Sequence, residues 1–349
     1  MVTKDTVNCI KQTYGTLQLS EGSAGFDIQQ AWLIKQYIPS KAFGVIYGAS
    51  GSYKSFAVLD MCCCLAANKT WNTQKVEGCA VVFIAAEGAV GIKRRIRAWE
   101  IAHKTNVNNL FVLDKSLSPS EPEERIKLVN AIFELEKQHS IKIGLIVFDT
   151  LSRCFIGDEN TARDMGHFIL GCETLIKTTT ATVLCIHHSG KDQSKGCRGS
   201  SKLFADADFV FQLQRPAGTS LSVSLVNHKQ KDDEPAKTLG MIFEKVTLGI
   251  YCDEGQPVSS LVRIDQALTD SPDNIPENTI VKVLSTIFDG SCNRSELRNA
   301  FFPKTTGNIS ARERTQFSRI LKKALESGQI TIKQISTKAS DSDQISLVH

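Results

Sequence analysis

The chain has 349 residues, with 41 lysines and arginines against 37 aspartates and glutamates, which gives a formal net charge of +4. This length exceeds that of one ordinary domain, so we expect a main domain and a smaller one. With 42% hydrophobic and 22% charged residues, the composition argues against wholesale disorder and fibrous repeats. No apolar run approaches the roughly 20 residues that cross a bilayer, and the first residues form no charged-then-apolar signal segment. We therefore expect a cytoplasmic protein with no membrane partner.

Eleven cysteines are spread along the chain without a C-x-x-C pair. A disulfide framework is not expected in a reducing compartment, and zinc knuckles need paired ligands. Cys185, His187 and Cys197 could surround a metal ion. Buried thiols beside a functional histidine are the favoured interpretation.

From about residue 40 to 250, short β-rich runs alternate with helical patterns, which is typical of a parallel sheet covered by helices. Strands are expected over residues 42–47, 80–85, 110–113, 143–148 and 181–186, and helices over 55–68, 92–104, 121–139 and 161–177. The helical patterns stop after residue 209. Further strands, expected as an antiparallel extension, are 209–213, 221–226, 239–243 and 246–251.

The turn-rich segment 269–277 predicts a linker between two domains. The main domain would then span residues 41–268, preceded by a segment 1–40 that packs on the core or on a neighbouring subunit. Residues 278–349 form the second domain. Helices are expected there over 278–288, 294–301 and 310–327, followed by strands over 329–335 and 344–348, which is the outline of a winged helix.

A G-x-x-x-x-G-K-[ST]-like loop lies between an expected strand and an expected helix, the context in which this pattern predicts a phosphate loop. Its residues are Gly48, Ala49, Ser50, Gly51, Ser52, Tyr53, Lys54 and Ser55. Lys54 would bridge the β- and γ-phosphates, and the Ser55 hydroxyl would bind Mg²⁺. The alternative is a structural Gly/Ser turn.

Tyr53 stands where such loops usually have a glycine. If this position needs a positive φ angle, tyrosine costs about 1 kcal/mol or more. If it does not, the tyrosine ring would be available to cover the nucleotide.

Two acids follow other expected strands. Asp149 ends an apolar run in the Walker B arrangement, where a carboxylate holds Mg²⁺ through water, although it could also cap the next turn. Glu87 ends another strand and would polarise water for attack on the γ-phosphate. Because carboxyl ends of parallel strands meet at one edge, these residues and Lys54 predict a single nucleotide-hydrolysing site.

The remaining strand ends carry histidines and basic residues. Adjacent residues at a strand end point to opposite sides, so only one of His187 and His188 would face the nucleotide, while the other would be a core histidine. The following loop bears Lys191, Lys195 and Arg198 and is either a solvated connection or a binding loop for a phosphate backbone. Lys229 and Lys231 would lie on the same side of a later strand.

The order of these motifs resembles the RepA-type AAA ATPases of plasmids and phages, within the RecA/DnaB group of ring-forming motors. The resemblance covers about residues 25–255. The matching segments are Phe26-Asp-Ile with Trp32-Leu-Ile, the loop Gly48–Ser55, Ala86-Glu-Gly88, Phe148-Asp-Thr-Leu-Ser-Arg153, Gly157-Asp-Glu-Asn160, His187-His-Ser-Gly-Lys191, Arg198-Gly-Ser-Ser201 and Lys229-Gln-Lys-Asp232.

The resemblance implies a RecA-like core, usually a hexamer with ATP between subunits, moving on single-stranded DNA. It implies that Glu87 is the catalytic base and His188 a polar γ-phosphate sensor. Lys229 and Lys231 match a basic pair that reaches the neighbouring subunit's nucleotide. Loops 152–160 and 189–200 would face DNA, with Arg198 ambiguous between DNA contact and nucleotide sensing. Tyr53 departs from the commonest loop pattern, which bears on hydrolysis more than on binding.

The basic excess is local. Residues 278–349 contain 11 basic and 6 acidic side chains, whereas residues 1–277 contain 30 and 31. On the helix expected over 310–327, Phe317, Ile320, Leu321, Ala324 and Leu325 fall on one arc. Arg312, Arg319, Lys322 and Lys323 fall on roughly the opposite arc. A basic face suits a recognition helix in a DNA groove, and a docking surface for a protein partner is the alternative.

Together these features predict an ATP-driven replicative DNA helicase of a mobile genetic element that uses Mg²⁺ and assembles as a ring, with a primase or initiator protein as a possible partner. The alternative is a replication initiator or regulator that binds DNA and uses ATP as an assembly switch without unwinding.

Overall fold

The structure is a computed structural model of the chain. It describes residues 12–190, 197–215, 221–264, 280–281, 283–284, 288–301, 311–334 and 340–348. The linker expected over 269–277 and most of the helix expected over 278–288 lie outside these ranges, as do Lys191 and Lys195.

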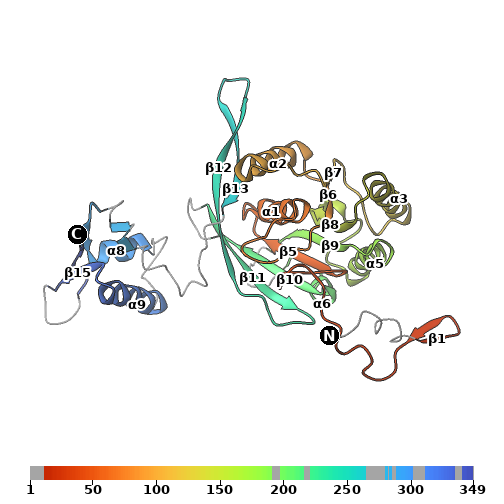
Figure 1. Cartoon of the computed structure of the whole chain (residues 1–349), viewed down its shortest axis with the longest axis horizontal. Coiled ribbons are helices and arrows are strands. Elements are labelled where there is room, and N and C mark those ends of the chain that lie inside the picture. Colours follow the sequence, from red (N-terminus) through yellow and green to blue (C-terminus); the bar gives the residue numbers. More distant parts are fainter. Residues whose placement is uncertain are drawn as a thin grey trace.

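A nine-stranded sheet organises the main part of the chain, in the order β13-β12-β11-β10-β5-β9-β8-β6-β7 (Figure 1). Six strands run parallel: β5 (Phe43–Gly48), β6 (Ala80–Ala85), β7 (Leu110–Leu113), β8 (Ile143–Asp149), β9 (Thr182–His188) and β10 (Phe209–Gln214). Three continue the sheet antiparallel: β11 (Ser222–Gln230), β12 (Leu239–Tyr251) and β13 (Pro257–Ile264). The predicted α/β class, a mainly parallel sheet with an antiparallel extension, is confirmed.

Helices cover both faces of this sheet, which explains why its central strands are apolar throughout. Helices α1 (Lys54–Ala66) and α2 (Ala89–His103) pack on one face, and α3 (Pro122–His139) and α5 (Ala162–Thr179) on the other (Figure 1). Alternate residues of one strand enter the two cores, as Phe83 and Ile84 of β6 do. Two short helices, α4 (Leu151–Cys154) and α6 (Lys202–Asp206), lie between these elements in the sequence.

The prediction of separate strands over 239–243 and 246–251 is wrong, because β12 is one 13-residue strand. Glu244 and Lys245, which interrupt the apolar pattern, are exposed positions that continue the pairing with β13. Strand β13 escaped prediction because its sequence is mixed. Beyond Ile242, strand β12 pairs with β13 and no longer with β11, so the two form a projecting hairpin (Figure 1).

A buried polar cluster fastens this hairpin to the helix that follows the phosphate loop. Asp60 on α1 accepts hydrogen bonds from the Trp71 indole (2.8 Å) and the Trp99 indole (3.0 Å) and is paired with Arg263 on β13. Asp60 and Arg263 are both buried. Because a buried carboxylate is costly unless its oxygens are satisfied, this cluster fixes how β13 packs against α1 and α2.

The N-terminal part of the described chain contains two small hairpins. Strands β3 (Trp32–Ile34) and β4 (Ile38–Pro39) contribute Leu33, Tyr37 and Ile38 to the core beside α1. Strands β1 (Gln12–Tyr14) and β2 (Leu17–Leu19) belong to an exposed segment.

The C-terminal part has its own core and a three-stranded sheet in the order β14-β16-β15. Its elements are β14 (Ser291–Asn293), α8 (Arg294–Phe301), α9 (Ala311–Glu326), β15 (Ile330–Lys333) and β16 (Gln344–Leu347). Helices α8 and α9 and strands β15 and β16 were predicted, and β14 was not. The winged helix remains a prediction. Leu325, expected among the apolar positions of α9, is exposed because it lies one position beyond the buried Ala324.

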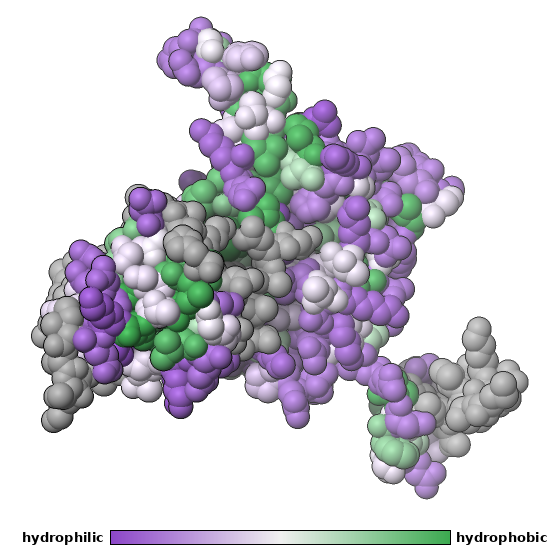
Figure 2. All heavy atoms as spheres, turned by 60° about the vertical axis from the view of Figure 1, so that its left-hand side comes forward, coloured by the Kyte–Doolittle hydropathy of each residue, from purple (hydrophilic) through white to green (hydrophobic). Residues whose placement is uncertain are grey.

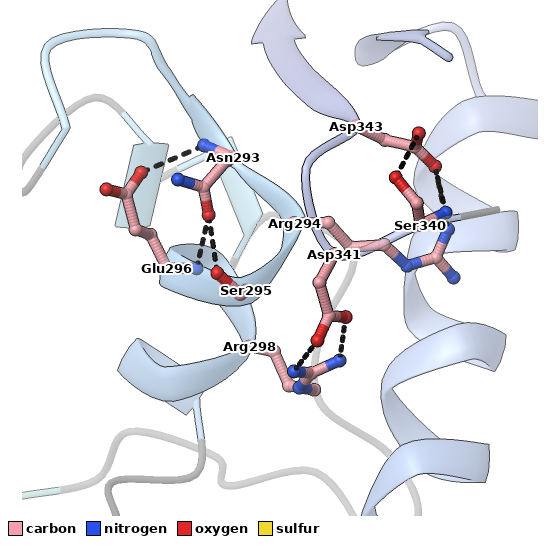
Figure 3. A network of polar contacts seen from close by, with 8 residues as sticks. All are labelled: Asn293, Arg294, Ser295, Glu296, Arg298, Ser340, Asp341 and Asp343. Carbon is pink, nitrogen blue, oxygen red and sulfur yellow. Dashed lines mark hydrogen bonds and ion pairs between the residues drawn. The ribbon is translucent and has the colours of Figure 1, made fainter. Parts of the chain in front are cut away.

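Polar contacts join the start of α8 to the segment before β16 (Figure 3). The Asn293 side chain accepts from Glu296 N at 2.9 Å and Glu296 accepts from Asn293 N at 3.0 Å, which is a reciprocal helix cap. Arg298 binds Asp341 through both terminal nitrogens, at 2.5 and 2.8 Å. Arg294 lies 3.8 Å from Asp343. Two of the local basic residues are therefore already engaged within this part.

In the described part of the chain, no helix is both long enough and apolar enough to cross a membrane.

Candidate nucleotide-binding site

Four neighbouring parallel strands deliver the predicted site residues to one edge of the sheet. The order β5-β9-β8-β6 brings together the ends that carry the phosphate loop, His188, Asp149 and Glu87. Parallel pairing requires all four carboxyl ends to meet at the same edge. The expected grouping of these residues is therefore present.

The phosphate loop curls around its own lysine. The Lys54 ammonium donates a hydrogen bond to the Ala49 carbonyl oxygen at 2.8 Å, and the side chain is only 6% exposed. Burial lowers the pKa of Lys54, while the charges of Asp149 and Glu87 act in the opposite direction. A cation inside a backbone loop at a helix N-terminus is the arrangement that binds phosphate groups.

Tyr53 has the left-handed conformation that glycine would adopt without strain, with φ 60° and ψ 25°. The position therefore does need a positive φ, the costly case of the two considered from the sequence. Its ring lies 5.5 Å from the Phe243 ring on β12 and 5.9 Å from Phe56. The Arg215 guanidinium lies 4.3 Å from the centre of the Tyr53 ring and donates to the Gly51 carbonyl at 3.1 Å. These contacts tie the loop to the antiparallel part of the sheet.

Asp149 and Ser55 have the chemistry of a magnesium site. Burial raises the pKa of Asp149 to about 6, opposed by a hydrogen bond from Ser55 and by the charge of Arg95. Among the described residues, Asp149 Oδ1 is buried without a hydrogen-bond partner. Within those ranges no cluster of three histidine, cysteine, aspartate or glutamate side chains could hold a metal ion alone. Hard oxygen donors completed by phosphate and water are what Mg²⁺ prefers, so these two residues fit it.

Glu87 is oriented by its neighbours at the end of β6. It accepts a hydrogen bond from the Thr150 hydroxyl at 2.9 Å and lies 3.9 Å from Arg153 Nε. A carboxylate held in this way beside the phosphate loop has the position that a general base requires.

Arg95 and Arg215 belong to the site region and were not predicted. Arg95 on α2 lies 4.2 Å from the centre of the Phe56 ring. Burial lowers its pKa, while the charges of Asp149 and Glu87 act in the opposite direction. Neither arginine has a sequence signal, since Arg95 is one of several basic residues on an amphipathic helix and Arg215 follows the end of β10.

The two histidines divide as the alternation of a strand requires. His187 is fully buried, and its Nε2 lies 2.9 Å from the Arg198 carbonyl oxygen. His188 is half-buried at the site edge, where burial and then the charge of Lys54 lower its pKa. Burial also raises the pKa of Cys197 to about 12 and that of Cys185 well above its usual value. Both thiols are therefore protonated, which favours buried thiols over metal ligands.

The loops expected to face DNA contact each other through residues 159–160 and 198–200. Arg198 Nε lies 3.6 Å from Glu159, and Ser200 N donates to the Glu159 carbonyl at 2.8 Å. Gly199 has φ 91°, and a Cβ there would approach the Glu159 carbonyl to 2.7 Å. On helix α9, Arg319 and Lys323 are exposed, and the backbone of Arg312 lies in the same helix.

The structure does not bring Lys229 and Lys231 to their own chain's phosphate loop. Lys229 donates to the carbonyls of Phe204 (3.2 Å) and Ala205 (2.6 Å) in α6, and Lys231 lies 3.2 Å from Asp208. Asp208 also accepts from the backbone N of Phe43, the first residue of β5. The lysine pair is therefore at the opposite edge of the sheet, one strand length, or roughly 17 Å, from the loop.

The fold and the site define a phosphate-loop ATPase with an α/β core. Residues 14–194 match the profile of an AAA domain family, and since the match covers more than half of the chain, the chain belongs to this family. No curated protein matches the sequence.

Two solved structures resemble it distantly. One is the ATPase domain of a helicase, which is 14% identical, with a TM-score of 0.44 over 58% of this chain and 82% of that one. The other is the RadB recombinase, which is 12% identical, with a TM-score of 0.42 over 59% of this chain and 88% of that one.

The Tyr53–Arg215 contact makes a testable prediction. Arg215→Ala should weaken ATP binding several-fold, because the loop loses both the stacked cation and the bond to Gly51. The same change in a Tyr53→Gly background should cost less, with a coupling of about 0.5–1 kcal/mol in a double-mutant cycle of ATP dissociation constants. Lys35→Ala removes a cation from the Trp32 ring, 5.3 Å away, outside the loop and is the matched control. Additive effects of the two changes would contradict the coupling.

The raised pKa of Asp149 makes a second prediction. The folded protein keeps this proton to about pH 6, whereas the ordinary value is 3.8, so ionising the buried carboxylate lowers the free energy of unfolding as the pH rises through this window. Without nucleotide, Asp149→Asn should therefore gain stability relative to the wild type between pH 4 and 6.5. Thermal unfolding of both proteins across this range measures the difference. A difference that stays constant would contradict the assignment.

Proposed function

We propose that this protein is an ATP-hydrolysing motor that acts on single-stranded DNA, assembled as a hexameric replicative helicase of a mobile genetic element. The observation that carries the proposal is the division of groups between two edges of one sheet. Lys54, Ser55, Glu87 and Asp149 lie at the carboxyl edge, and Lys229 and Lys231 lie at the other.

Within one chain, each group has a separate role in phosphoryl transfer. Lys54 would neutralise charge on the β- and γ-phosphates, with the loop amides fixing their position. Glu87, oriented by Thr150 and Arg153, would accept a proton from the attacking water. His188, whose lowered pKa favours the neutral form, would contact the γ-phosphate without adding charge. Mg²⁺ held by Ser55 and Asp149 would supply charge neutralisation for the phosphates.

A ring supplies what one chain lacks. If the edge that carries Lys229 and Lys231 faces the phosphate-loop edge of the next copy, the lysine pair would stabilise charge that develops in the neighbour's transition state. In the isolated chain these ammonium groups bind carbonyl oxygens of α6 and the Asp208 carboxylate. Both are acceptors that phosphate oxygens could replace.

DNA contact is assigned to two places. Arg198 with Lys191 and Lys195 would line the ring channel, and Arg312, Arg319 and Lys323 on α9 would bind phosphates from the C-terminal part. Arg294 and Arg298 are less suited to this role, because they already bind Asp343 and Asp341. A winged-helix C-terminal domain would then serve in loading or site recognition, with a primase or initiator as a further partner.

The proposal is tested by ATP hydrolysis with and without single-stranded DNA. We expect DNA to stimulate the wild type, and Lys54→Ala to lower the rate roughly 100-fold or more, because a charge that stabilises the transition state is lost. Lys177→Ala, an exposed lysine near the end of α5, is the control and should have the wild-type rate.

Tight ATP binding with DNA-independent, negligible turnover would contradict the motor. It would instead favour the ATP-switched initiator or regulator. A strand-separation assay on a tailed duplex then distinguishes unwinding from translocation alone.

A further inference from the structure

The segment 13–31 is an arm that has local structure yet is exposed along its length. It comprises the β1–β2 hairpin and a series of turns closed by backbone hydrogen bonds, including Phe26 N to Ser23 O (3.0 Å) and Ile28 N to Gly25 O (3.1 Å). Every residue in it is exposed except the half-buried Gly25. In Figure 1 the arm runs away from the core.

The arm carries large apolar side chains on this exposed surface. Leu17 and Leu19 on β2 are followed by Phe26 and Ile28, and Phe26 is 87% exposed. Figure 2 shows apolar colour on the arm at the lower right. Local clusters of exposed large apolar residues on a protein mark interaction sites.

Two helices on one outer face of the core carry a second exposed apolar surface. Ile126 and Phe133 are seven residues apart on α3 and therefore share a helix face. Leu170 is exposed on α5, the helix that packs beside α3. We call these three residues the acceptor patch. Because the arm and the patch are both exposed in the same chain, the arm does not cover its own patch.

The chemistry of the arm selects its occupant. Residues 13–31 contain Glu21 and Asp27 and no lysine or arginine, which disfavours nucleic acid and anionic membranes because both carry negative charge. An apolar surface on another protein remains, and the acceptor patch is such a surface. Contact between two different surfaces of identical chains is heterologous and continues from copy to copy, closing into a ring when the rotation allows.

The root of the arm lies at the edge that carries the lysine pair. Gln30 and Trp32 line a cavity together with Asp208 and Lys231. A copy held by the arm is thus tethered beside Lys231, the side chain that the ring requires at the neighbour's nucleotide.

We infer that the arm of one copy docks on the acceptor patch of a second copy and forms the subunit contact of the ring, which rests on the ring assembly in the proposed function. The arm makes the contact independent of nucleotide chemistry. Loss of the contact therefore leaves the phosphate loop of each chain intact.

The test measures particle mass by light scattering after size exclusion, with the full chain, an unhydrolysable ATP analogue and single-stranded DNA. Leu17→Asp with Phe26→Asp gives the arm variant, and Ile126→Asp with Phe133→Asp gives the patch variant. Each should be monomeric alone. Mixed in equal amounts they should form a complex of two chains and nothing larger, because one intact arm meets one intact patch. Ile250→Asp, an equally exposed apolar position on β12, should assemble as the wild type does.

Several results would overturn the inference. These are a wild type that stays monomeric, an arm variant that assembles normally, or a mixture that remains monomeric. Since the arm residues lie outside the core, the arm variant should fold, and its thermal unfolding checks this even if the patch variant is unstable. ATP binding by the monomeric variants separates the two proposals: retained binding with unchanged assembly rejects the arm contact alone, whereas absence of ATP binding in the wild type rejects the proposed function.

Discussion

The direction of strand pairing around β5 determines where every functional side chain lies. Strand β5 runs parallel to β9 and β10, so the ends of β5, β9, β8 and β6 meet at one edge. The single reversal from β10 to β11 returns the chain to the opposite edge, where Lys229 and Lys231 lie. Asp208 holds this edge together, binding Phe43 N with one oxygen and Lys231 with the other. A chain arranged in this way needs a second copy to bring the lysine pair to a nucleotide.

The antiparallel extension also supports the phosphate loop from two sides. Phe243 on β12 and Arg215 after β10 contact Tyr53, which has a backbone conformation that costs about 1 kcal/mol for a residue other than glycine. On the other side of α1, Asp60 is paired with Arg263 on β13. The unusual tyrosine is thus part of a packed layer that offsets its backbone strain.

Much of the core was predictable because its physics is local. The continuous apolar runs of β6, β8 and β9 could only be strands buried on both faces, and the acids that end them had to meet at one edge. Prediction failed where a residue depends on distant partners. Strand β13 pairs along β12 without an apolar pattern of its own, and Arg95 and Arg215 acquire their positions from the Phe56 and Tyr53 rings. The separation of the lysine pair from its own site also needed the sheet order, which no sequence pattern contains.

The central claim, that two copies share each catalytic site, is tested most directly by mixing two defective proteins and measuring ATP hydrolysis. One is Lys54→Ala, and the other combines Lys229→Ala with Lys231→Ala. Each should be nearly inactive alone. An equal mixture should recover about a quarter of the wild-type rate, since a quarter of randomly formed interfaces would pair an intact loop with an intact lysine pair. No recovery at any ratio, or a wild-type rate for the lysine-pair variant alone, would contradict the claim.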